Sequence, residues 1–101
     1  MSKLLLIARG PRYFAYGDEK AFFGWLESIP CVASVEGRLR NIHIKLKRQP
    51  SDSDLRELLA LFFRYRMNLK RLAVYRTARN AHWFDDPQKY WHTKIFGRSQ
   101  S

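Results

Sequence analysis

The sequence lacks the features that mark secreted and membrane proteins. Its single cysteine, Cys31, cannot form a disulfide within the chain, and such scarcity is typical of a reducing compartment. The apolar run at residues 4–8 is too short for the core of a signal peptide and far too short to cross a bilayer. We therefore expect a cytoplasmic protein that makes no contact with membranes.

Acidic residues are also scarce. The chain has 9 Asp and Glu against 19 Lys and Arg, which gives a formal net charge of +10. No acid occurs between Gly37 and Gln49 or between Leu58 and Phe84. Six of the nine acids lie at expected helix starts, where they complement the helix dipole. A basic surplus of this size favours partners that carry phosphates or carboxylates.

Apolar and aromatic residues, in contrast, are abundant. Hydrophobic residues make up 46% of the chain and aromatic residues 15%, well above the range of disordered chains. A chain of this length forms one modest core. We expect a single α+β domain over residues 1–97, followed by a frayed tail at 98–101.

The N-terminal half predicts a strand, a helix and a hairpin. Continuous apolar character over residues 3–9 is typical of a strand buried on both faces. A loop at 10–17 follows, and helical spacing after Asp18 predicts a helix over 18–29. Alternation over 31–47 predicts a two-stranded hairpin.

The C-terminal half predicts a helix, a strand and a last short helix. Ser51 and Asp54 form a capping-box pattern for a helix over 51–68. Residues 70–76 predict a fourth strand. Asp86, Pro87 and Gly97 are typical of the ends of a helix over 87–96. The resulting order is that of a ferredoxin-like β-α-β-β-α-β antiparallel sheet with an extra C-terminal helix.

Aromatic residues concentrate in HWFDDPQKYWH, residues 82–92. Because the first strand is apolar at both parities, the second face of the sheet needs a cover, and we expect the tail to fold back on it. The alternatives are an interface with a homodimer or a partner protein, and exposed stacking on bases. The candidate partner-binding residues are Trp83, Phe84, Tyr90 and Trp91.

Binding of nucleic acid without sequence preference is a second hypothesis. RNA-recognition domains share the expected fold plan, but they stack bases on aromatic residues of two central strands. The corresponding face here offers no aromatic, which leaves phosphate contacts or a merely solvated basic face. The candidate residues are Arg38, Arg40, His43, Lys45, Lys47, Arg64, Arg66, Lys70 and Arg71.

Catalytic and metal-binding patterns are weak. No carboxylate close in sequence orients His43 as a general base, and Cys31 suits a core position better than a nucleophile. We therefore expect no enzyme activity, no cofactor and no metal. A dimeric α+β barrel enzyme is a lesser alternative, by analogy of fold alone. The candidate metal ligands are His82, Asp85, Asp86 and His92. Their spacing does not match any compact ligand pattern.

Three segments of the chain carry a family resemblance: FFGWLESIPCV, LRELLALFFRYRMNLKRLAVYR and NAHWFDDPQKYWHTKIFG. Together they resemble small bacterial immunity proteins, the partners of toxins delivered by contact-dependent growth inhibition or related systems. The resemblance implies a cytoplasmic inhibitor that binds and neutralises a toxin domain and has no catalytic residue. An inhibitor this basic would meet an acidic surface on its toxin or use a mostly apolar interface.

Overall fold

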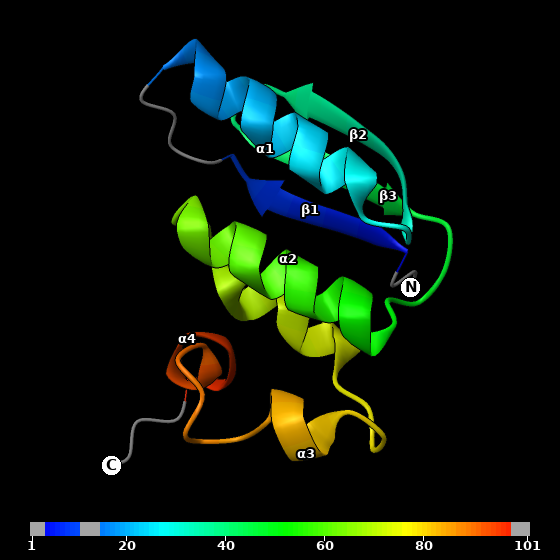
Figure 1. Cartoon of the computed structure of the whole chain (residues 1–101), viewed down its shortest axis with the longest axis vertical. Coiled ribbons are helices and arrows are strands. Elements are labelled where there is room, and N and C mark those ends of the chain that lie inside the picture. The colour runs from blue at the N-terminus through cyan, green and yellow to red at the C-terminus, as the bar shows by residue number, and fades with distance from the viewer. Residues whose placement is uncertain (1–3, 11–14, 98–101) are drawn as a thin grey trace.

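The computed structural model describes residues 4–10 and 15–97, drawn in colour in Figure 1. The expected loop residues 11–14 and the frayed tail at 98–101 lie outside the described residues. In the described ranges, no helix has both the length and the apolar character needed to cross a bilayer. The elements are β1 (Leu5–Arg9), α1 (Tyr16–Ser28), β2 (Val32–Arg38), β3 (Asn41–Leu46), α2 (Asp52–Arg64), the 3-10 helix η1 (Leu69–Tyr75), α3 (Ala81–Phe84) and α4 (His92–Phe96).

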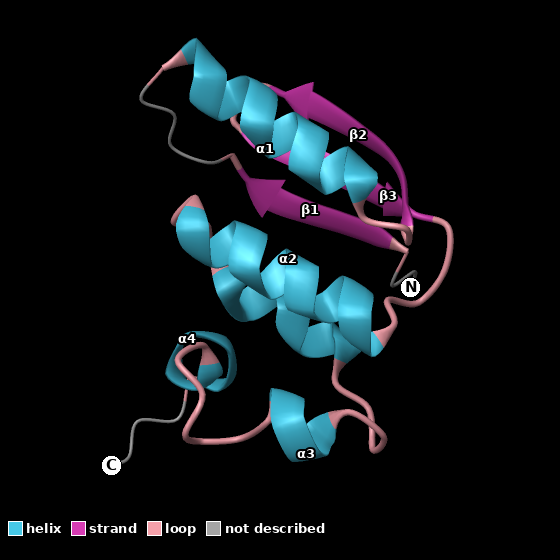
Figure 2. Cartoon of the chain, in the orientation of Figure 1, coloured by secondary structure: helices cyan, strands magenta, loops and turns pink. Residues whose placement is uncertain are grey.

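A three-stranded antiparallel sheet dominates the N-terminal half, as the magenta arrows of Figure 2 show. β3 lies between β1 and β2. Because side chains alternate along a strand, one face of this sheet is apolar and packs into the core. α1 packs against β2 on this face (Figure 1). The α+β class and the hairpin are thus confirmed, and the buried face carries Leu6, Ala8, Ile42, Ile44 and Leu46.

α2 begins with the capping box that its sequence predicts. The Ser51 hydroxyl accepts from the Asp54 backbone N–H at 3.1 Å, and the Asp54 carboxylate accepts from the Ser51 backbone N–H at 2.9 Å. The helix ends at Arg64, before the expected residue 68. The reason is a turn in which Arg66 adopts the left-handed region, with φ of 58°.

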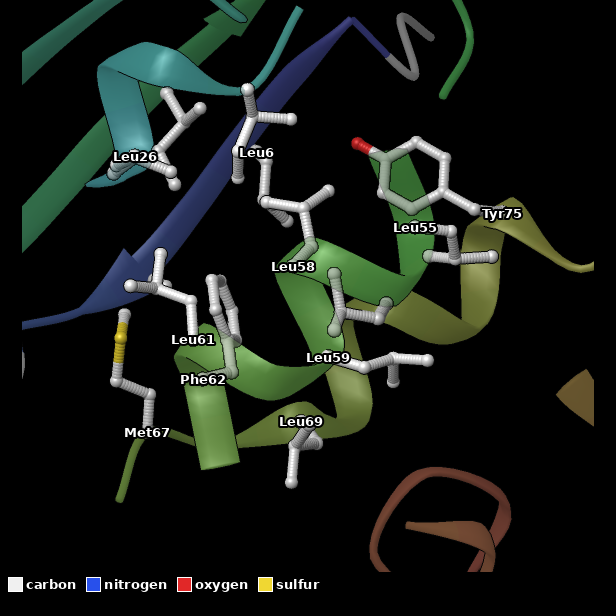
Figure 3. Packing of buried hydrophobic residues seen from close by; sticks show 14 of the residues in the cluster. Leu6, Leu26, Leu55, Leu58, Leu59, Leu61, Phe62, Met67, Leu69 and Tyr75 are labelled. Atoms are coloured by element: carbon white, nitrogen blue, oxygen red, sulfur yellow. The ribbon is translucent and has the colours of Figure 1, made fainter. Parts of the chain in front are cut away.

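α2 buries side chains in more than one direction. In Figure 3, Leu58 points toward Leu6 of β1, whereas Leu69 of η1 lies on the opposite side of the helix. The helix therefore joins the sheet to the C-terminal elements in one continuous apolar cluster, which runs from Leu6 to Ile95.

The expected fourth strand is wrong, because residues 69–75 form η1 instead. The buried side chains of this segment are Leu69, Leu72 and Tyr75, whose spacing of three matches the three residues per turn of a 3-10 helix rather than the period of a strand. The Asn68 side chain accepts from the Lys70 backbone N–H at 2.9 Å and caps its start. The described sheet thus has three strands, and η1 packs beside β1.

The last expected helix is only partly present. α4 covers His92–Phe96, and Gly97 ends it in the left-handed conformation, with φ of 62°, as its sequence position predicts. Asp86 does not start this helix. Its carboxylate accepts from the Gln88 backbone N–H at 2.9 Å and its carbonyl accepts from the Lys89 N–H at 3.0 Å, which makes a tight turn before α4.

The tail does not fold back on the second face of the sheet, so that expectation is wrong. α4 packs against η1, which in turn packs against α2 (Figure 1). The indole N–H of Trp91 donates to the carbonyl of Phe84 at 2.8 Å and ties α4 to α3. The physical reason is that α2 and η1 together form a second apolar surface, on which the tail packs. A strand at residues 70–76 would not have formed that surface, so the sequence prediction did not include it.

Candidate binding surface on the sheet

The second face of the sheet is accessible, and we call it the open face. It is formed by the strand residues whose side chains point away from the core, as the alternation and the register of the sheet define them. Its nine residues are Leu5, Ile7 and Arg9 of β1, Asn41, His43 and Lys45 of β3, and Ser34, Glu36 and Arg38 of β2.

Apolar side chains on the open face remain in contact with solvent. Leu5 is 43% exposed and Ile7 is half-buried. The charged residues of the face are all exposed, and His43 is half-buried between its neighbours. The open face therefore combines an apolar strip on β1 with polar and basic groups on β3 and β2.

The strand register arranges the open face in three rows. Arg9 lies opposite Asn41, and Asn41 lies opposite Arg38. Side chains paired in this way stand about 5 Å apart at Cβ. This row borders the β2–β3 turn, where exposed Arg40 adds another guanidinium. The basic groups therefore gather at the turn end of the sheet. The other rows are Ile7–His43–Glu36 and Leu5–Lys45–Ser34.

Glu36 is the one acid on the open face. Its carboxylate accepts a hydrogen bond from the Arg38 guanidinium at 3.1 Å. This bond, together with the charges of Arg38, His43 and Lys45, holds the pKa of Glu36 below its ordinary value. Because both partners are exposed to water, the pair adds little to stability. The pair engages Arg38, whereas the ion pairs of the described residues include neither Arg9 nor Lys45.

The other predicted phosphate-binding residues lie elsewhere. Lys47 follows the end of β3 and is exposed. The second basic block lies on the far side of β1 from β3, on α2, on the turn after it and on η1. The structure therefore brings Arg38, Arg40, His43 and Lys45 together and leaves apart Arg64, Arg66, Lys70 and Arg71.

Most of the predicted partner-binding aromatics are buried within the chain. Trp83, Phe84 and Trp91 have exposed fractions of 6%, 0% and 8%. Tyr90 is 51% exposed and makes an edge contact with Phe63, with ring centroids 4.6 Å apart. A role of the tail in binding another protein stays a prediction, and it now concerns Tyr90, since the three other side chains are not accessible in the single chain.

Cys31 is fully buried, as expected for a small core residue. Burial raises the pKa of its thiol to about 11, so the reactive thiolate is scarce at neutral pH.

The C-terminal ionic cluster joins three elements. The Asp85 carboxylate accepts from Arg76 Nε at 2.7 Å and contacts His92 Nε2 at 2.8 Å. The hydrogen bond from Arg76 holds the pKa of Asp85 below its ordinary value. These contacts link the end of η1, the end of α3 and the start of α4. Across residues 4–10 and 15–97, no three His, Cys, Asp or Glu side chains lie close enough together to hold a metal ion.

The sequence reasoning missed part of the open face. The sequence predicts that Arg9 ends a strand buried on both faces and that Leu5 and Ile7 are covered. One signal in the sequence indicates this exposure. Arg9 follows Leu5 and Ile7 at every second position, so all three side chains lie on the same face, and a charged residue favours a face in contact with water. Leu39, between two arginines in the hairpin turn, was also overlooked.

Comparison with known proteins adds no relative: no protein-family model, curated protein or solved structure matches this chain.

Proposed function

We propose that this protein is a non-enzymatic binding protein of the cytoplasm that docks an acidic partner protein on its open face. One observation carries the proposal: Arg9, Arg38 and Lys45 share an accessible surface with the exposed aliphatic side chain of Leu5. Most other large apolar side chains of the sheet and tail are buried, so this surface stands out as apolar and basic together.

The chemistry of the open face fits a protein partner. An aliphatic strip gains free energy when another apolar surface covers it. The surrounding cations then select a partner whose contact surface carries carboxylates, and they raise the rate of encounter. A net charge of +10 acts in the same sense over longer distances. It also opposes association with a second copy of the same basic chain.

We infer from the family resemblance that docking blocks the partner, as an immunity protein blocks a toxin domain. In that role the open face covers an acidic region of the toxin. We also infer a ferredoxin-like variant in which η1 stands beside β1 where a fourth strand would be, an arrangement that keeps the open face free of helices.

Binding of nucleic acid remains the second candidate, because the same three cations suit phosphates. The open face carries no aromatic residue on which bases would stack, so any such binding is of the phosphate backbone. It would weaken steeply with added salt, by about a thousandfold over a fourfold rise if six phosphates are contacted. An interface with an apolar centre responds much less.

The test is affinity capture of the tagged protein from its native cells, with and without nuclease. It compares the wild type with Arg9→Glu/Lys45→Glu, which reverses the charge of two cations on the open face. A matched control, Lys70→Glu/Arg71→Glu, changes the net charge equally on exposed residues of η1. We expect one protein in equal amounts to the bait, resistant to nuclease, lost with the first variant and kept with the second.

Two results contradict the proposal. One is a partner that the reversed open face still binds as well as the wild type does. The other is a broad set of nucleoproteins that disappears on nuclease treatment, which favours the nucleic-acid candidate.

A further inference from the structure

The turn between β2 and β3 presents an apolar side chain with no contact to the core. The two strands are joined by two residues only, Leu39 and Arg40, and the register pairs Arg38 with Asn41 directly beside them. Leu39 has an exposed fraction of 106%, the highest among the large hydrophobic residues described. Its side chain therefore contributes no packing to this fold.

The backbone of Leu39 is also unfavourable for a leucine. Its φ is 55°, whereas Arg40 is not among the residues of positive φ. Positive φ at only the first of two central residues is the pattern of a type II′ hairpin turn, in which glycine is preferred at that position. Leucine thus stands at a site where glycine would fold with less strain, and where its side chain has nothing to touch.

The turn is held in a defined position. The Gly10 backbone N–H donates to the Arg40 carbonyl at 2.6 Å and ties the turn to the end of β1. A Cβ on Gly10 would lie 3.1 Å from that carbonyl oxygen, so glycine permits this close approach. Leu39 therefore lies in a turn whose position is fixed, next to the Arg9–Asn41–Arg38 row.

The open face alone is too small for a stable interface. It spans about 14 Å along the strands and 10 Å across them, whereas a standard interface buries about 800 Å² on each partner. Contact with a partner must therefore continue past an edge of the face. The turn end is where cations are densest, because Arg9, Arg38 and Arg40 meet there.

We propose that Leu39 is the apolar anchor of the docking surface and inserts into a pocket of the partner protein, while Arg38 and Arg40 meet carboxylates at the rim of that pocket. This inference rests on the proposed function, whose acidic partner it describes more closely. It explains why a strained and fully exposed leucine occupies a site suited to glycine.

The first experiment titrates the protein captured by the wild type against purified wild type, Leu39→Gly and Leu39→Met. We expect Leu39→Gly to weaken binding by about tenfold or more, the scale of one buried leucine, while its melting temperature stays equal or rises. Leu39→Met keeps a flexible apolar side chain of similar volume and retains affinity to within about threefold. The control Val74→Ala, at a half-exposed residue of η1, leaves affinity unchanged.

The second experiment measures whether position 39 is covered. Leu39→Cys is labelled with a maleimide with and without the captured protein. Background labelling is slow, because Cys31 is fully buried and the pKa of its thiol is about 11. We expect the partner to slow labelling of Leu39→Cys by about tenfold or more and to leave Val74→Cys unaffected.

The outcomes separate this inference from the proposed function. If Arg9→Glu/Lys45→Glu abolishes binding but Leu39→Gly binds to within twofold of the wild type, the open face docks the partner and Leu39 is no anchor. Unchanged labelling of Leu39→Cys in the complex overturns the inference in the same way. If neither variant weakens binding, or no nuclease-resistant partner is captured, both proposals fail.

Discussion

The sheet and the C-terminal segment from Leu69 to Gly97 bury their apolar side chains in different ways. β1 and β3 alternate, so each places one set of side chains in the core and leaves the other set facing water. The C-terminal segment consists of short helical turns whose aromatic side chains close on one another and on α2, as in the contact of Trp83 with Trp91 at 6.0 Å between ring centroids. One region therefore keeps an accessible face, and the other is mostly interior.

This difference shows that aromatic density is a poor guide to a binding surface. The aromatic side chains of the tail bury a large area and contact one another, so they stabilise its short helices rather than form a surface. The open face, in contrast, has only a few aliphatic and basic residues. They stay accessible because the helices cover only the other face of the sheet.

The largest effect is expected in the aromatic tail. Phe84 is fully buried and makes edge contacts with Phe96 at 5.3 Å between ring centroids. Phe84→Ala should lower the free energy of unfolding by about 3–5 kcal/mol, through lost burial and the cavity left behind. Tyr90→Ala, at the half-exposed end of the same segment, should cost about 1 kcal/mol or less. Urea denaturation measures both, and a loss for Phe84→Ala as small as the one expected for Tyr90→Ala would contradict the role given to Phe84 in the core.

A smaller effect is expected from the buried polar link at the end of η1. The Asn80 amide donates to the Tyr75 carbonyl at 2.9 Å and accepts from the Thr77 backbone N–H at 2.8 Å. Asn80→Ala leaves these buried backbone groups without their amide partner and should cost about 1–3 kcal/mol.

A matched control exists in Asn68, whose side chain also bonds a backbone N–H but is exposed to water. Asn68→Ala should cost about 1 kcal/mol or less, because water replaces the lost acceptor. Similar losses for Asn68→Ala and Asn80→Ala in urea denaturation would mean that burial of Asn80 does not add to its contribution.

Sequence patterns were reliable where the structure is periodic. The hairpin and the start of α2 follow from alternation and from the Ser51–Asp54 pattern, both of which are local. The strand predicted over residues 70–76 rests on a short apolar run, whereas the buried residues Leu69, Leu72 and Tyr75 follow the period of three of a 3-10 helix. Only the contacts with α2 and β1 settle which period is used.

Prediction of the candidate site was partial for a related reason. Outward parity predicts the basic residues of β3, and the acid-free block that begins at Gly37 adds Arg38 of β2 and Arg40. The accessibility of Leu5 and Ile7 was not, because it depends on where the tail packs, which is a matter of tertiary contacts. Leu39 was missed because a single apolar residue in a turn has no periodic signal at all.

A pH-dependent effect of about 1 kcal/mol is expected at the contacts that hold the C-terminal elements together. Arg76 holds the pKa of Asp85 below its ordinary value, so this carboxylate stabilises the fold above about pH 4, the range of unfolded aspartate. That contribution is lost as the pH falls through the lower pKa of the folded state. Asp85→Asn should therefore lower stability by about 1 kcal/mol or less at pH 7, since the pair is partly exposed.

The measurement is urea denaturation of wild type and Asp85→Asn between pH 7 and pH 3. The difference between them should shrink below about pH 4, as the wild-type carboxylate takes up its proton. Asp54 also has a pKa below its ordinary value, because the hydrogen bonds from Ser51 and Arg48 outweigh its burial. It titrates in both proteins and cancels in the comparison. A constant difference across the range would contradict the role given to Asp85.

The smallest effects distinguish the starts of the two long helices. α2 begins with the Ser51–Asp54 capping box, whereas α1 begins after Ala15, which has no side-chain cap. Asp18 stands three residues after Ala15, just as Asp54 follows Ser51. Ala15→Ser therefore recreates the same pattern, and we expect it to raise the free energy of unfolding by about 0.5–1 kcal/mol, while Ser51→Ala lowers it by about 1 kcal/mol. Both changes in the free energy of unfolding are small, so urea denaturation should be analysed with one m-value shared by all variants. If Ala15→Ser gives no gain while Ser51→Ala gives its full loss, then α1 draws its stability from packing of Phe22 and Leu26 alone, and its first turn is not held as that of α2 is.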